Sequence, residues 1–208
     1  MGKNILAIEF ILCVFGLLVW NRVDLGPQET VRVYRNQSLV SNPSYSTGHI
    51  FRRGETISTG KNEFVEVLVG ELIMIDLDEN TNLELKSLSR NNVRVGFGHG
   101  RILVTATDGG VITVDTPTAQ NTLKTSGKLS ASREDLAKAS FIGYDFNRLT
   151  SIIPIVNTIY TSIPLLNQTF EVTNPITIHD VNPPSVENMT FDEKTDARKE
   201  FYEWAAQN

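Results

Sequence analysis

Apolar and polar residues alternate along most of the chain between residues 50 and 127. Within several short runs the apolar residues recur at every second position, as at Val65, Val67 and Val69, which places them on one face of a β-strand. The runs are VEVLV (65–69), LIMIDL (72–77), LELKSL (83–88), NVRVGF (92–97), RILVTAT (101–107) and GVITVDT (110–116). They follow one another at roughly 8–12 residues, without an intervening amphipathic helix, which predicts an all-β sandwich, barrel or solenoid rather than a parallel βαβ sheet.

Residues on either side of this region also contain β-like runs. An early run, TVRVY (30–34), interrupts a segment of proline, glycine, serine and asparagine. Later runs are IIPIV (152–156), IYTSI (159–163), FEVT (170–173) and ITIHDV (176–181). Because Pro154, Pro164 and Pro175 cannot donate to a sheet, we expect edge strands or short turns here. SREDLAKAS (132–140) has the composition of a short capped helix or a loop.

The first twenty residues, MGKNILAIEFILCVFGLLVW, are the most apolar part of the chain. From Ile5 to Trp20 the only charged residue is Glu9. Sixteen helical residues cover roughly 24 Å, slightly less than a hydrocarbon core of about 30 Å. We therefore predict a transmembrane anchor over residues 5–21, with a cytoplasmic stub of residues 1–4. Lys3 before the span favours an amino terminus inside the cell, with the rest of the chain outside.

Two alternatives to an uncleaved anchor remain open. A cleaved signal peptide needs small residues before the cut, and NRVD (21–24) supplies no A-x-A pattern. A buried helix of a soluble protein is the other alternative.

The last residues predict a short helix. The segment FDEKTDARKEFYEWAAQN (191–208) starts with acids, lacks glycine and proline, and places Phe201 and Trp204 three residues apart, as on one helical face. The predicted organisation is thus an anchor (5–21), a juxtamembrane spacer (22–47), a β-domain (48–182) and a linker with a C-terminal helix (183–208).

Five stretches of the chain together resemble the FecR-type domain. They are RRGETISTGKNEFVEVLV (52–69), VGELIMIDLDENTNLELKSL (69–88), VRVGFGHGRILVTA (93–106), GVITVDTPTA (110–119) and LKTSGKLSAS (123–132). The tail FYEWAAQN is similar to a tryptophan-containing helix that often follows such domains. Val69–Gly70 stands where the family usually has Asp–Gly.

The resemblance implies a mainly β, extracytoplasmic domain of solenoid-like or sandwich-like stacked strands in a bacterial envelope. Named members of the family relay a signal to a sigma factor through a cytoplasmic N-terminal domain of several tens of residues. The stub of residues 1–4 is too short for that, so we expect no sigma-factor binding through a cytoplasmic domain.

Charge and cysteine content exclude further classes of function and site. The net charge is −5 and the pI is near 5.3, and no basic run is present, so nucleic-acid binding is not expected. The single cysteine, Cys13, excludes an intrachain disulfide and a thiolate zinc cluster.

Candidate metal and catalytic groups are sparse. His49, His99 and His179 are far apart in sequence and lack the short-range spacing of a metal site. The stretch IDLDEN (75–80) begins like a calcium loop, but Thr81 stands where glycine is required and Ser87 where the bidentate glutamate should be. We therefore expect an acidic turn, no cofactor, no metal and no enzymatic activity.

The stretch VGFGHGRILV (95–104) resembles a phosphate-binding loop at first sight. Its third glycine, Gly100, comes one residue early for a dinucleotide fingerprint, and a strand rather than a helix follows it. We therefore predict a tight turn or a bulge with positive φ between two strands. His99 and Arg101 are the predicted binding surface.

The sequence thus predicts a single-pass protein of the cytoplasmic membrane whose β-domain binds or scaffolds an envelope protein or a glycan. One alternative is a signalling component that acts through a membrane partner in contact with Glu9. The other is a cell-wall or polysaccharide-processing protein with a site built from scattered carboxylates.

Overall fold

The computed structural model describes residues 29–38, 42–89, 92–106, 110–124, 140–145, 147–155 and 158–206. The predicted stub, the predicted anchor over residues 5–21 with Glu9, and nearly all of the predicted helix over 132–140 lie outside these residues. Among the described residues, no helix has the length and apolarity needed to cross a bilayer.

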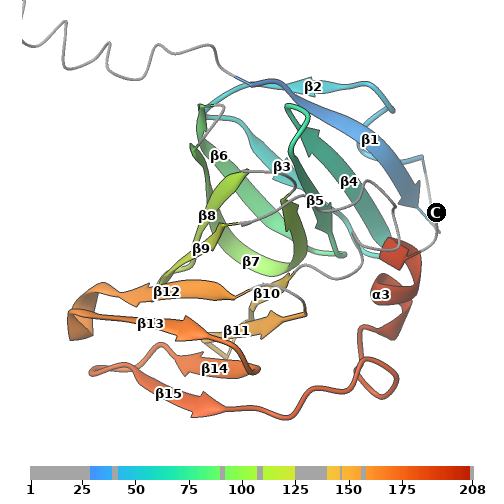
Figure 1. The fold of residues 1–208 in the computed structure, drawn as a ribbon. Helices are drawn as coiled ribbons and strands as arrows, with labels where there is room; N and C mark the ends of the chain where they lie inside the picture. The colour runs from blue at the N-terminus through green and yellow to red at the C-terminus, as the bar shows by residue number, and fades with distance from the viewer. Residues whose placement is uncertain are drawn as a thin grey trace, which may run out of the picture.

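The described part of the chain is mainly β, as the alternation predicts, and its strands form a two-sheet sandwich (Figure 1). Sheet A has the order β3 (Thr56–Ser58), β6 (Asn82–Ser89), β7 (Asn92–Ala106), β8 (Val111–Asp115), β9 (Gln120–Lys124), β12 (Ile159–Ile163) and β13 (Gln168–Val172). Sheet B has the order β2 (Ile50–Phe51), β1 (Val31–Ser38), β4 (Glu63–Val69), β5 (Ile73–Leu77), β7, β10 (Ser140–Tyr144), β11 (Leu149–Pro154), β14 (Ile176–His179) and β15 (Ser185–Asn188).

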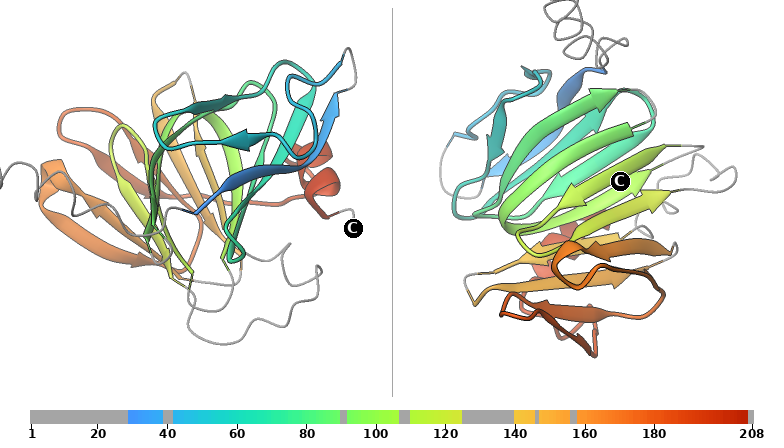
Figure 2. Two further views of the ribbon diagram at one scale, coloured as in Figure 1. Left: turned by 90° about the horizontal axis from the view of Figure 1, so that it is seen from above. Right: turned by 90° about the vertical axis from the view of Figure 1, so that its left-hand side faces the viewer.

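Strand β7 belongs to both sheets. Its first half pairs with β6 and β8, and its second half pairs with β5 and β10. Neighbouring strands stack one above another along the long direction of the molecule, from β1 at one end to β15 at the other (Figure 2). The pairing of β7 with β8 is parallel, and the other pairings of the described strands are antiparallel.

The glycine stretch therefore lies inside one continuous strand, and the predicted tight turn is wrong. A bulge is present instead, because Asn82 pairs with His99 while Leu83 pairs with Phe97, which leaves Gly98 as the extra residue. Gly100 has a φ of +107°, and a Cβ there would lie 2.5 Å from the Cα of Thr81. The glycines let the strand bend from one sheet into the other without a steric clash.

The apolar alternation also requires this bulge. Val93, Val95 and Phe97 point into the sandwich from sheet A, and Ile102, Val104 and Ala106 point into it from sheet B. Phe97 and Ile102 are an odd number of residues apart, so a regular strand would turn one of the two sets outward. The extra residue restores the inward orientation of both.

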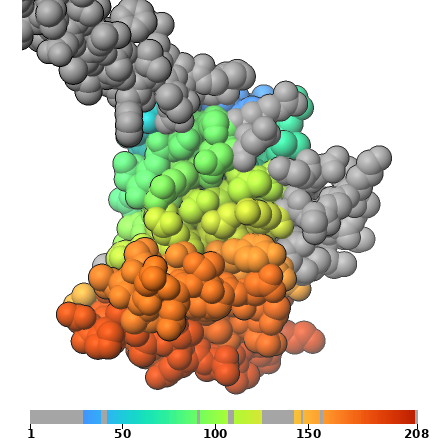
Figure 3. Space-filling model, turned by 60° about the vertical axis from the view of Figure 1, so that its left-hand side comes forward, coloured from blue at the N-terminus to red at the C-terminus, as the bar shows by residue number. Residues whose placement is uncertain are grey.

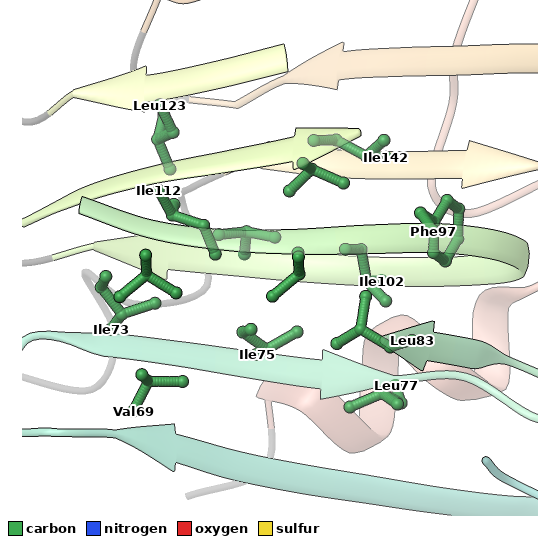
Figure 4. Packing of buried hydrophobic residues seen from close by; sticks show 14 of the residues in the cluster. Val69, Ile73, Ile75, Leu77, Leu83, Phe97, Ile102, Ile112, Leu123 and Ile142 are labelled. Carbon is green, nitrogen blue, oxygen red and sulfur yellow. The ribbon is translucent and has the colours of Figure 1, made fainter. Parts of the chain in front are cut away.

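Buried aliphatic side chains from both sheets form one continuous interior (Figure 4). Ile73, Ile75 and Leu77 of β5 pack in this interior with Leu83 of β6 and with Ile102 of β7, the register partner of Leu77 in sheet B. The interior also contains a polar contact: the hydroxyl of Thr161 donates to Oδ1 of Asn121 at 3.0 Å, and both residues are fully buried. This bond satisfies groups that would otherwise be costly to bury.

Two predicted boundaries and the proline prediction need correction. Strand β1 pairs with β4 over seven residue pairs and buries Val31 and Val33, so the segment 22–47 contributes a strand to the sandwich. Strand β15, in the segment predicted as linker, pairs with β14. Of the runs expected at an edge, β13 is an edge strand, whereas β11, β12 and β14 are interior strands. Pro154 ends β11, Pro164 follows β12 and Pro175 precedes β14, where no ladder N–H is required.

Candidate interaction surfaces

The C-terminal residues cover the outer face of sheet B. The helix α3 (Lys199–Ala206) forms within the tail where the sequence predicts one, and the chain reaches it from β15 along the side of the sandwich (Figure 1). We call residues 189–206 the strap. Phe201, Tyr202 and Trp204 of α3 are buried together with three outward-facing residues of sheet B: Phe64 of β4, Leu103 of β7 and Ile153 of β11. The ring of Trp204 lies 5.4 Å from that of Phe64, centroid to centroid.

Arg101 attaches the strap to β7. Its Nη1 donates to Oδ1 of Asp196 at 2.9 Å and to the hydroxyl of Tyr202, and that hydroxyl donates to Asp196 at 3.1 Å. The side chains of Arg101 and Asp196 are only about one fifth exposed, so the ion pair is partly shielded from water. Arg101, which the sequence predicts to be part of a binding surface, therefore binds the chain's own C-terminal segment.

A second arginine attaches the strap to the acidic turn between β5 and β6. Nη1 of Arg198 lies 2.6 Å from Oε1 of Glu79, and its Nε lies 3.4 Å from Oδ2 of Asp78. This is the turn whose IDLDEN sequence begins like a calcium loop. Here a guanidinium from the strap supplies the positive charge beside the carboxylates.

The two carboxylates of the turn have opposite pKa shifts. Burial raises the pKa of Asp78 to about 6, although Arg198 and the backbone N–H of Glu79 oppose the rise. The pKa of Glu79 is lowered, first because it accepts a hydrogen bond from the backbone N–H of Asn62 and then because of Arg198. Asp78 is thus the carboxyl whose charge changes at mildly acidic pH.

A further ionic group lies beneath Trp204. Arg35 of β1 contacts Glu66 of β4 at 3.0 Å, and its guanidinium carbon lies 4.0 Å from the centre of the Trp204 ring. Glu66 is buried. The strap therefore covers a charged pair as well as an apolar patch, and Trp204 adds a cation–π contact to it.

The three histidines lie apart from one another. His99 is on β7 near the bulge, and burial lowers its pKa, with Arg198 acting in the same direction and Asp145 in the opposite one. His49 packs against Tyr45 and Phe51, and His179 contacts Glu187 across β14 and β15. Within the described ranges, no group of three or more histidine, cysteine or acidic side chains is arranged to hold a metal ion.

The outer face of sheet A has a different composition. Polar side chains form a row across β7, β8, β9, β12 and β13 in register: Arg94, Thr113, Thr122, Tyr160 and Glu171. The hydroxyls of Thr113 and Thr122 are 3.1 Å apart, and Arg94 binds Asp115 at 2.7 Å.

Both sheets end in an edge strand at the end of the molecule far from β1, where the orange segment of Figure 3 lies. Within the part of the chain that the structure describes, β13 pairs only with β12, and β15 only with β14. Strand β15 has four residues and follows Pro183 and Pro184, features that protect an edge from further pairing. Strand β13, with sequence QTFEV, contains no proline or lysine.

Comparisons with known proteins give few similarities. No protein-family model matches the chain, and no curated protein matches it. Two crystal structures of a candidate anti-sigma factor from Parabacteroides distasonis ATCC 8503 are similar, with TM-scores of 0.48 and 0.49 and sequence identities of 15% and 14%. Each alignment covers 70% of this chain and 62% of the other, so the chain spans less than two thirds of the length of that protein.

Sequence reasoning identified α3 and Arg101 but not their contact. Nothing in the local sequence distinguishes Asp196 and Arg198, because their partners Arg101 and Glu79 lie about a hundred residues earlier in the chain. A local signal does exist. The positions of sheet B that alternate with its inward-facing residues would be polar if this face met water. Three of them are instead apolar, Phe64, Leu103 and Ile153, which indicates that another segment covers this face.

Proposed function

We propose that the chain is a membrane-anchored, FecR-like binding module that displays its β-sandwich in the cell envelope and binds an extended segment of another envelope protein. The predicted anchor over residues 5–21 and the five FecR-like stretches support the location. Among the described strands β13 pairs only with β12, and this open edge supports the mode of binding and is the observation on which the proposal depends.

An unpaired strand edge presents backbone donors and acceptors to any extended chain that reaches it. The exposed side chains of β13 are those of Gln168, Thr169 and Glu171. An added strand would continue sheet A and would align its own side chains with these. Because strand addition uses backbone hydrogen bonds, it needs neither a cofactor nor a catalytic group.

A site-specific photocrosslinker tests this mode of binding in intact cells. Placed at Thr169 on β13, it should join the protein to a partner as a discrete larger species. The matched control is Thr122, which points outward from the same sheet but on the interior strand β9. Equal crosslinking from both positions would contradict strand addition.

Proline substitution at neighbouring positions sharpens the test. In an antiparallel edge strand, successive N–H groups point alternately to the neighbour and to the free edge. With the photocrosslinker moved to the exposed Glu171, one of Thr169→Pro and Phe170→Pro should therefore have the melting temperature of the alanine variant at the same position, a comparison that also accounts for the partly buried ring of Phe170. That variant should lose the crosslink, because proline removes an edge donor. A proline variant that is as stable as its matched alanine variant and has undiminished crosslinking at both positions would contradict the proposal.

The topology is tested by reporters fused after residue 208. A reporter that works only outside the cytoplasm should be active there, whereas activity of a cytoplasm-only reporter would exclude the predicted orientation.

A further inference from the structure

The strap is packed on the sandwich but is not part of its interior. The buried aliphatic interior between the two sheets contains no residue of the strap, and the strap residues belong to a separate cluster with Phe64, Leu103 and Ile153. Detachment of the strap would therefore leave the interior between the sheets complete. Such a satellite element can open at a lower free energy than the whole domain.

The connection between β15 and α3 can act as a hinge. Residues 192–195 are exposed, and their turn is closed by hydrogen bonds within itself, from the N–H groups of Thr195 and Asp196 to the carbonyl of Asp192 at 3.1 and 3.0 Å. The contacts that hold the strap in place come instead from sheet B, through Arg101, Asp78 and Glu79. If the backbone changed direction at this turn, the strap residues that follow it could make the same contacts with the sheet B of another molecule.

The face beneath the strap needs a cover of particular chemistry. It presents aromatic and aliphatic side chains together with the carboxylates of Asp78 and Glu79 and the guanidinium of Arg101. A complementary segment must carry a large apolar helix face, an arginine for the acidic turn and a carboxylate for Arg101. The strap has these groups in Phe201 and Trp204, Arg198 and Asp196, so the strap of a second copy fits without any new contact.

We infer that the outer face of sheet B is a self-association surface, which binds the strap of a second copy of this chain to give a strap-exchanged dimer. Such an exchange replaces each intramolecular contact by an identical intermolecular one, so its cost in free energy is small. The Arg198–Glu79 pair gives the partner strap its position on the acidic turn, and Arg101 with Asp196 fixes its direction.

Charge reversal in two separate copies tests the exchange. In the full chain in detergent, Glu79→Arg reverses the face and Arg198→Glu reverses the strap, so each variant alone opposes like charges. In an exchanged pair both contacts are matched, because the reversed strap of one copy meets the reversed face of the other, and the wild-type strap meets the wild-type face. We expect each variant alone at the monomer mass and the equimolar mixture at twice that mass by light scattering after size exclusion.

The control uses the exposed side of the same helix. Lys199 and Glu203 form a solvent-exposed pair at 3.4 Å and contribute nothing to the contact between strap and face, so Lys199→Glu and Glu203→Lys, alone or mixed, should have the same dimer mass as the wild-type chain. A mixture of the Glu79→Arg and Arg198→Glu variants that stays at the monomer mass, with both variants folded by circular dichroism, would overturn the inference.

A second measurement covers the case in which a reversed variant does not fold. A fluorescent peptide of residues 189–206 is added in excess to the wild-type full chain. We expect the wild-type peptide to be incorporated at least tenfold more than the same peptide with Arg198→Glu. Equal incorporation of the two peptides, or none, would overturn the inference.

Discussion

The two outer faces of the sandwich differ although both sheets share one interior. Sheet B presents Phe64, Leu103 and Ile153 outward and is covered by the strap, whereas sheet A presents Thr113, Thr122 and Arg94 outward. An antiparallel sheet can face water on one side if that side is polar. The difference shows that the outward residues of each sheet decide whether the chain must supply a cover.

The largest expected effect is on the covered face. Phe201→Ala removes a ring that is 1% exposed, so the free energy of unfolding should fall by about 4 kcal/mol. Tyr160→Ala is the matched change on sheet A, where the ring is 38% exposed, and it should cost about 1 kcal/mol or less. Urea denaturation of both variants measures the two values. Similar losses would contradict the contrast between the faces.

The next effect concerns the strand that joins the two faces. Gly100→Ala should lower the free energy of unfolding by about 3 kcal/mol, because alanine is strained at positive φ and its Cβ meets the backbone of Thr81. The control is Gly98→Ala, for which the nearest atoms lie 4.0 Å away. Thermal unfolding of both variants compares them. If the Gly98 variant were the less stable, the assignment of the bend would be wrong.

The stability of the protein should depend on pH through Asp78, which lies beside Arg198 of the strap. The pKa of Asp78 in the folded protein, about 6, lies above the ordinary value of 3.8, so the folded state binds this proton more tightly than the unfolded state. The contribution of Asp78 to stability is therefore largest below about pH 4 and is lost as the pH rises to about 6. The free energy of unfolding of Asp78→Asn, relative to that of wild type, should rise by about 2 kcal/mol from pH 4 to pH 7. Urea unfolding of both proteins at the two pH values measures this change. A constant difference between the two proteins would contradict the raised pKa.

The smallest expected effects on the free energy of unfolding come from replacing one arginine on each face. Arg101→Gln should cost about 1.5 kcal/mol, because it removes partly buried, charge-assisted hydrogen bonds to the strap. Arg94→Gln on sheet A removes an ion pair in which the arginine side chain is 43% exposed, and it should cost about 0.5 kcal/mol. Chemical denaturation in low and high salt measures both, and only the Arg94 loss should shrink markedly with salt.

Local patterns predicted the elements more accurately than their arrangement. The alternation in β4, β5, β6 and β8 and the aromatic spacing in α3 are visible in short windows, and the structure contains these elements. The continuity of β7 was missed because glycines spaced two residues apart fit a turn as well as a strand. The pairing of both halves of β7 with neighbouring strands shows that it is continuous, and the clash that a Cβ at Gly100 would make with Thr81 explains the glycine.

The candidate surfaces depend on contacts between distant residues. Arg101 was identified from its place after the glycines, but its partners Asp196 and Tyr202 become neighbours only when the strap crosses sheet B. The open edge of β13 likewise follows from the strand order, which a single sequence does not reveal. The predicted anchor and Glu9 remain predictions.

Solvent access to Trp204 tests the account most directly. The chain has two tryptophans, so in a Trp20→Phe background the emission comes from Trp204, which is 4% exposed on the inner side of the strap. Acrylamide should quench it weakly in the otherwise wild-type full chain and several-fold more strongly after Arg198→Glu, which opposes the acidic turn. Strong quenching already in the parent protein, equal to that of an exposed tryptophan, would show that the strap does not cover sheet B.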